Sequence, residues 1–137
     1  MRSTLAAGLA ATRRFVVDSA RTIEFMGEEG RVYATPALVR DIEIACREFL
    51  LQHLDPDEDS VGTRVEIDHL APTLMDMEVE IAFRVAEVKG RLVVFEVSAR
   101  DGVESIARAR HVRFVSDVAK TKERLAAKRA KAAGAAL

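Results

Sequence analysis

The chain has 137 residues, of which 49% are apolar, and these values predict one domain, residues 1–137, around a single hydrophobic core. Its 21 basic and 22 acidic side chains leave a formal net charge of -1, which excludes a global field that would attract nucleic acid or an anionic membrane. No apolar run approaches the roughly 20 residues of a membrane-spanning helix, and the weakly apolar start passes into a strand-like run rather than a signal peptide, so we expect a cytoplasmic protein.

The single cysteine, Cys46, excludes an internal disulfide and a cysteine-rich metal site. Its sequence neighbours are apolar and no histidine is near it, which favours a small buried hydrophobic residue over a nucleophile. We expect no metal site and no resident cofactor.

The first half of the chain contains short strands and one strong helix signal. Runs of β-branched and aromatic residues at 14–18 and 22–25 predict one or two edge strands, and the glycine-flanked acidic segment 27–30 predicts a loop. Thr35 followed by Pro36 is typical of a helix start. Residues 37–51 then carry apolar side chains on nearly every side, which predicts a buried helix.

After an acidic, proline-containing loop at 55–60, the apolar period changes from helical to alternating. Val65, Ile67 and His69 share one face of a first strand, and the same alternation recurs over 79–85 and 93–99.

The end of the chain completes a meander of strands. Lys89-Gly90 and Asp101-Gly102 predict the turns that join the second strand to the third and the third to a fourth, at about 104–115. A basic helix or tail follows at about 118–137. Short strands, one buried helix and an antiparallel meander indicate an α+β fold, and this order is compatible with a hot-dog, a cystatin-like or another α+β sandwich.

A set of ordered motifs narrows this choice. They are Ala34-Thr35-Pro36, Glu43-Ile44-Ala45-Cys46, Ser60-Val61-Gly62-Thr63, His69, and Asp101-Gly102-Val103 followed by His111 and Arg113. From Val32 to Val115 the pattern resembles the fluoroacetyl-CoA thioesterase family. In that family a threonine at the start of the helix, a glutamate eight residues later, a glycine after the next loop and a histidine on the next strand form the catalytic site.

This resemblance implies a hot-dog fold, an antiparallel sheet wrapped around one central buried helix, and an enzyme that hydrolyses a small acyl-CoA to the free acid and CoA. It implies catalytic roles for Thr35, Glu43 and His69, and substrate-binding roles for Gly62 and Arg113. It also implies a homodimer, because similar hot-dog domains pair through their sheets and place their sites at the subunit boundary.

One segment departs from the family pattern. Residues 26–31 contain glutamate and glycine where the fluoroacetyl-specific enzyme is known for an aromatic lid residue. The resemblance therefore implies a general short-chain acyl-CoA thioesterase.

The residues alone leave other roles open. Glu43 could form a structural ion pair with Arg40 or Arg47, its helical neighbours, or serve as a buried base or nucleophile. Thr35 could be an ordinary helix cap, and about 12 Å of helix separates it from Glu43, too far for a direct bond in a regular helix. His69 points to the helix side of its strand, as a core histidine or as an acid or base.

Two further positions also have two readings. Gly62 could allow close approach of the acyl group or simply end a loop. Arg113 shares strand parity with two alanines, which leaves room for an inward guanidinium, whereas Arg108 and Arg110 predict a solvated face. The basic residues of the terminal helix could likewise be solvated, or could attract the phosphates of CoA.

Two other functions remain as rivals. One is a domain that binds or senses acyl-CoA without hydrolysing it. The other is a hot-dog dehydratase, but its Asp and His pair is spaced about five residues apart, and Asp68-His69 does not fit that spacing.

Overall fold

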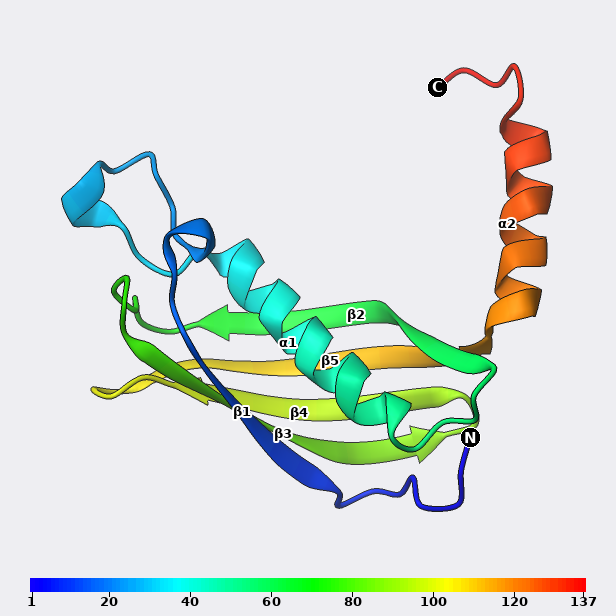
Figure 1. Cartoon of the computed structure of the whole chain (residues 1–137), viewed down its shortest axis with the longest axis horizontal. Coiled ribbons are helices and arrows are strands. Elements are labelled where there is room, and N and C mark those ends of the chain that lie inside the picture. The colour runs from blue at the N-terminus through cyan, green and yellow to red at the C-terminus, as the bar shows by residue number, and fades with distance from the viewer.

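The computed structural model describes residues 1–137. The strands are β1 (Ala10–Val16), β2 (Glu58–His69), β3 (Glu78–Lys89), β4 (Leu92–Arg100) and β5 (Ser105–Asp117), and the helices are α1 (Thr35–Leu51) and α2 (Val118–Ala132). All strand pairs are antiparallel, in the order β1-β3-β4-β5-β2. The predicted α+β arrangement is confirmed, with α1 lying along one face of the sheet (Figure 1).

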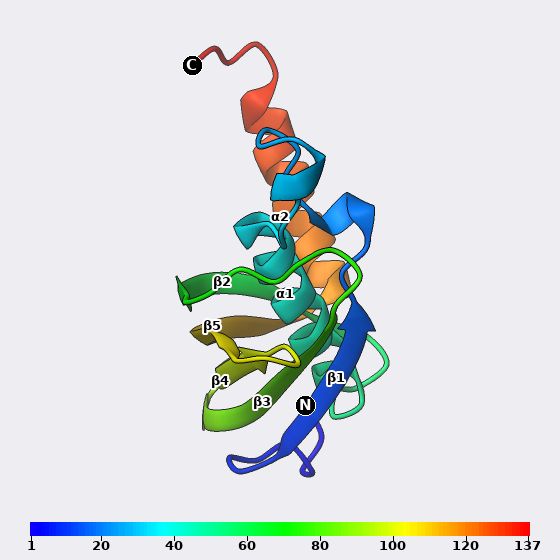
Figure 2. The same ribbon diagram turned by 90° about the vertical axis from the view of Figure 1, so that its left-hand side faces the viewer.

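The sheet curves around α1, so that β1 and β2, the two edge strands, lie on either side of the helix (Figure 2). The core forms where the apolar side of α1 packs against the inward-pointing residues of the strands, which are every second residue along each strand. The fully buried helix residues are Leu38, Ile42, Ala45, Cys46 and Leu50. They pack against alternate residues of β3 and β4, as the sequence predicts; these include Val79, Ile81, Phe83, Val85, Val93, Phe95, Val97 and Ala99.

The prediction that α1 is buried on nearly every side is wrong for the isolated chain. Arg40, Ile44 and Arg47 are exposed, because the sheet covers only the inner side of the helix.

The N-terminal strand predictions are partly wrong. β1 begins at Ala10 and ends at Val16, two residues before the predicted end. Segment 22–25 is not a strand: Thr22 forms only an isolated bridge with Tyr33. The physical reason is the preceding 3-10 turn, in which the Asp18 carboxylate accepts the backbone N–H of Arg21 and turns the chain out of the sheet.

Two connections differ in detail from the predicted turns. The predicted loop 55–60 ends early, because β2 begins at Glu58. Lys89-Gly90 joins β3 to β4 as predicted, and Gly90 has a φ of 59°. The turn after β4 spans four residues, because the Asp101 side chain accepts the backbone N–H groups of Val103 and Glu104 and the hydroxyl of Thr73.

The basic helix α2 projects away from the sheet (Figures 1 and 2). None of its residues is buried, and the Asp117 side chain caps its N-terminus by accepting the N–H of Lys120. Neither helix of the protein combines the length and the apolar composition that crossing a membrane requires.

Candidate active site

Thr35 and His69 meet where the start of α1 lies over the end of β2. Thr35 is the first residue of α1, and the N-cap position belongs to Ala34, so the alternative reading of Thr35 as the helix cap is wrong. The Thr35 hydroxyl instead shares a hydrogen bond of 2.8 Å with Nδ1 of His69. His69 points toward the helix, as its strand parity predicts.

The other ring nitrogen of His69, Nε2, is buried and has no hydrogen-bond partner. Burial lowers the pKa of His69, which favours a neutral imidazole near pH 7. Beside it lies a cavity of about 380 Å³, whose apolar lining includes Phe25, Leu70 and Pro72. Phe25 comes just before the segment 26–31 that lacks an aromatic residue, and the sequence reading did not assign it to the site.

A largely buried carboxylate, with a side chain 11% exposed, holds α1 in place near its middle. Asp41 accepts a hydrogen bond of 2.5 Å from the Tyr33 hydroxyl and two from the Arg21 guanidinium, at 2.9 and 3.2 Å. Burial raises the pKa of Tyr33, and the bond to Asp41 raises it further, so the phenol stays protonated and donates. The sequence analysis missed this set, because its members are distant in the sequence and belong to no motif.

Glu43 lies directly over Gly62. A Cβ atom at Gly62 would lie 2.6 Å from Oε2 of Glu43 and 3.1 Å from Cε1 of His111. Gly62 is inside β2, just before a β-bulge between Gly62 and Arg64, so its reading as a loop terminator is wrong. Glycine at this position lets the Glu43 carboxylate approach the strand, because a side chain would occupy the same space.

The ionic partner of Glu43 is Arg113, whose NH1 lies 3.4 Å from Oε2. The predicted structural pair with Arg40 or Arg47 is wrong, because Arg47 instead binds Asp59 through two hydrogen bonds of 3.0 and 2.6 Å. Glu43 keeps 41% of its side chain exposed, so it is both anchored and accessible.

Arg113 itself is buried, as predicted, and its guanidinium is held on several sides. It donates to the hydroxyl and the carbonyl of Ser60, each at 2.8 Å, and to Nε2 of His111 at 3.1 Å. His111 is fully buried, and its Nδ1 lies 2.9 Å from the carbonyl oxygen of Arg64. Ser60 and His111 belong to the sequence motifs, but no role was predicted for them, although His111 shares the strand parity of Arg113.

The predicted residues therefore form two clusters. Thr35 and His69 form one, and Glu43, Gly62 and Arg113 form the other. Thr35, Val39 and Glu43 follow one another at four-residue steps along one side of α1, so about 12 Å of helix axis separates the ends of this row. No hydrogen bond joins Thr35 to Glu43, as the sequence analysis predicts. A cavity of about 300 Å³ opens beside Val39, Glu43 and Arg113.

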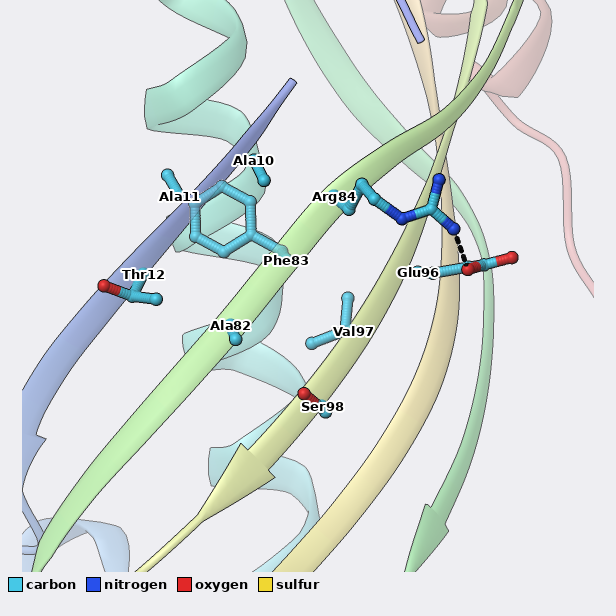
Figure 3. Close-up of a pocket in the computed structure, with 9 residues that line it drawn as sticks. All are labelled: Ala10, Ala11, Thr12, Ala82, Phe83, Arg84, Glu96, Val97 and Ser98. Atoms are coloured by element: carbon cyan, nitrogen blue, oxygen red, sulfur yellow. Dashed lines mark hydrogen bonds and ion pairs between the residues drawn. The ribbon is translucent and has the colours of Figure 1, made fainter. Parts of the chain in front are cut away.

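Another cavity, of about 620 Å³, lies elsewhere, across β1, β3 and β4. Figure 3 shows its polar side chains: Thr12, Ser98, and Arg84 paired with Glu96. None of the predicted site residues lines it, and its only acid and base neutralise each other. Beside that pair it holds only the hydroxyls of Thr12 and Ser98, with no histidine or unpaired carboxylate to activate them.

Cys46 is buried on the side of α1 that faces the sheet, and burial raises the pKa of its thiol to about 12. A thiol with that pKa is not a nucleophile at neutral pH. Its interpretation as a small buried hydrophobic residue is confirmed.

Comparison with known proteins agrees with this geometry. A family model described as fluoroacetyl-CoA-specific thioesterase matches residues 17–119. The fluoroacetyl-CoA thioesterase of Streptantibioticus cattleyicolor is 31% identical over 122 residues, covering 84% of this chain and 88% of that protein. The chain belongs to the fluoroacetyl-CoA-specific thioesterase family.

Solved structures support the same family and fold. A crystal structure of a variant of the fluoroacetyl-CoA-specific thioesterase, in complex with fluoroacetate and CoA, is 31% identical, with a TM-score of 0.79, and the match covers 85% of this chain and 99% of that one. A hot-dog-like protein from Thermanaerovibrio acidaminovorans is 23% identical, with a TM-score of 0.82, and the match covers 89% of this chain and 91% of that one. The hot-dog fold is thus confirmed.

The close approach of Glu43 to Gly62 gives a first prediction for this family member. In Gly62→Ala the new methyl group displaces the flexible Glu43 carboxylate, so the free energy of unfolding falls by only about 1 to 2 kcal/mol. Thioester hydrolysis, the reaction after which the family is named, falls by roughly 10²-fold, because the carboxylate is misplaced.

The matched control is Gly102→Ala, where an added Cβ meets nothing within 4 Å. Chemical denaturation and a hydrolysis assay on both variants check the prediction. Equal activity in Gly62→Ala and the control contradicts it.

Proposed function

We propose that the protein hydrolyses the thioester of a short-chain acyl-CoA, releasing the free acid and CoA, with Thr35, Glu43 and His69 as catalytic residues. The observation that carries the proposal is Glu43, a partly exposed carboxylate held by Arg113 over a strand glycine, in a chain of a thioesterase family. The family relatives supply the substrate class: one is named for fluoroacetyl-CoA, and one has been crystallised with fluoroacetate and CoA.

In this proposal Glu43 initiates the reaction at the thioester carbonyl carbon. It either attacks that carbon itself or takes a proton from a water molecule that does so. In both routes a C–O bond forms, the C–S bond breaks and the sulfur departs with the bonding electron pair. When Glu43 itself attacks, the product is a mixed anhydride with Glu43, and water then hydrolyses it to release the acid and restore the carboxylate. Gly62 leaves room for the carboxylate, and Arg113 orients it. Arg113 also lines the cavity beside Glu43, where we propose that the substrate binds.

His69 suits the departing thiolate. When the Thr35 hydroxyl donates to Nδ1, the proton of the neutral ring is on Nε2, the nitrogen that has no partner in the protein. That N–H can donate to the sulfur as negative charge develops on it. In this proposal the Thr35 hydroxyl is therefore the donor and His69 is the Nε2–H tautomer. Because about 12 Å of helix axis separates Thr35 from Glu43 within one chain, His69 and Glu43 can act on one thioester only if the second copy of the dimer proposed below supplies one of them.

The acyl group is proposed to be short and not restricted to fluoroacetyl. The cavity beside His69 is mostly apolar, and the segment 26–31 contains no aromatic residue. We also propose a cytoplasmic location, on the composition of the chain alone.

The test of the proposed chemistry is Glu43→Gln, which keeps the size of the side chain and removes its charge. We expect kcat for acyl-CoA hydrolysis to fall by roughly 10² or more, the range for loss of a general base or nucleophile. Melting temperature should fall only modestly, because the amide oxygen of the new glutamine can still accept from Arg113, which also keeps its bonds to Ser60 and His111.

Glu48→Gln is the matched control, because Glu48 is on the same helix and pairs with Arg13 at the surface. Both variants are assayed with a panel of acyl-CoAs and by thermal melting. Full activity in Glu43→Gln contradicts the mechanism and favours an acyl-CoA binding domain without chemistry.

We further propose a homodimer formed through the free edge of β2. This edge strand is 12 residues long, and Val61 on it is 52% exposed. Ile44, on the adjoining outer side of α1, is also exposed. A long strand with unpaired backbone groups and apolar side chains is a template for pairing with a second copy.

Sedimentation velocity at micromolar concentration should therefore show a dimer. Val61→Lys, which places a charge in the proposed contact, should shift the protein toward the monomer. A wild-type protein that sediments only as a monomer contradicts the proposal.

The terminal helix α2 is proposed to attract the phosphates of CoA. Its basic side chains are Lys120, Lys122, Arg124, Lys128, Arg129 and Lys131, and none lies within ion-pair distance of a carboxylate. Unpaired, exposed charges on a short segment create a local positive field, although the chain as a whole is close to neutral.

Replacing Lys120, Arg124 and Lys128 together by Gln should raise KM and leave kcat nearly unchanged. Added salt should raise KM of the wild-type protein and have a smaller effect on the variant, because salt screens exposed charges. An unchanged KM contradicts the proposal and indicates that α2 is a solvated helix without a role in binding.

A further inference from the structure

His111 is a fully buried polar residue to which the proposed chemistry gives no task. Its two ring nitrogens have partners that determine its protonation. Arginine can only donate, so Nε2, which faces NH1 of Arg113 at 3.1 Å, must accept with its lone pair. The proton of the neutral ring is therefore on Nδ1, which donates to the Arg64 carbonyl at 2.9 Å.

The Arg64 carbonyl reaches His111 because of the bulge in β2. Gly62 pairs with Arg113 and Arg64 with Val112, so Thr63 is the extra residue of the strand. A bulge changes the direction of nearby backbone groups, and it is a common means of redirecting groups near functional sites. Here it provides the acceptor that selects the tautomer of His111.

The selected tautomer in turn constrains Arg113. Its Nε and NH2 donate to Ser60, and NH1 donates to His111 and lies 3.4 Å from Glu43. With three of its bonds made to strand groups, the guanidinium has one orientation, and NH1 is the part of it that meets the carboxylate. The neutral His111 lone pair is thus one of the contacts that aim Arg113 at Glu43.

We infer that His111 is a positioning residue for Glu43, acting through Arg113, and that it does so only as the neutral Nδ1–H tautomer. This inference rests on the proposed function for its catalytic consequence, whereas the tautomer itself does not depend on it. His111 contacts no reacting atom.

Protonation of His111 opposes this arrangement. The imidazolium would hold two N–H donors and would place a second cation 3.1 Å from Arg113. The charged group opposite on α1 is Glu43, and the Cys46 thiol is close by. Burial lowers the pKa of His111; the Arg64 carbonyl raises it, Arg113 lowers it and Glu43 raises it, with a net lowering. The neutral form therefore persists below the pH at which an exposed histidine becomes charged.

Three variants at position 111 separate positioning from packing. His111→Gln places an amide oxygen near the position of Nε2 and has no titrating group. His111→Asn keeps a donor near Arg64 but is too short to accept from Arg113. His111→Phe lacks both the donor and the acceptor. We expect kcat to fall roughly 10²-fold in the Asn and Phe variants with KM little changed. The Gln variant should retain most of kcat. Its log kcat should fall less steeply at acid pH, with a slope smaller by one, because one fewer group becomes protonated.

The matched control is His53→Asn, because His53 is outside the site and bonds only to Thr4. Wild-type kcat in His111→Asn, or a Gln variant as impaired as the Phe variant, overturns the inference. Where a variant fails to fold, nitrogen NMR of His111 in the wild-type protein decides: an Nδ1–H signal at neutral pH supports the inference and an Nε2–H signal overturns it. If the wild-type protein hydrolyses no acyl-CoA, the proposed function fails, and the NMR measurement still tests the tautomer.

Discussion

A guanidinium buried inside a protein must have its N–H groups satisfied, and this constraint on Arg113 organises the site. A buried charge without partners costs several kcal/mol, so its surroundings have to supply acceptors. Ser60 supplies two, His111 one, and Glu43 the opposite charge. Since each acceptor is on β2, β5 or α1, satisfying Arg113 also determines how the helix lies on this edge of the sheet.

The position of α1 links this cluster to the other one. The helix is held near its middle by two anchors: Asp41, which binds Tyr33 and Arg21, and, two residues later on a different side, Glu43, which binds Arg113. Two anchors on one rigid helix set both its rotation and its position along β2. Thr35 and Glu43 of one chain therefore keep their separation along the row that includes Val39. Rigid elements hold catalytic groups more accurately than loops do.

The sequence predicted the fold well because its signals were periodic and local. The alternation of β3 and β4 and the apolar side of α1 were visible directly, and the inward Arg113 followed from strand parity. The partner of Glu43 was not predicted, because helical spacing offered Arg40 and Arg47 while the true partner is 70 residues away. Likewise, the bulge after Gly62 and the turn beyond Asp101 were not predicted, because they depend on side-chain contacts that have no local sequence pattern. The prediction for Thr35 was partly right: the helix begins at Thr35, but its hydroxyl binds His69 instead of capping the helix.

The near-neutral net charge hides an uneven distribution that bears on function. Every arginine within the five strands has a carboxylate within 4 Å, including Arg14 with Glu80 and Arg108 with Asp68. Paired charges produce little electrostatic field beyond their neighbours, so the outer face of the sheet is well solvated but has a weak net field. The bases of α2 are left without partners, and α2 follows β5, the strand that carries Arg113. An anionic ligand approaching the molecule therefore meets most of the unpaired positive charge on the one element that leads directly from the site.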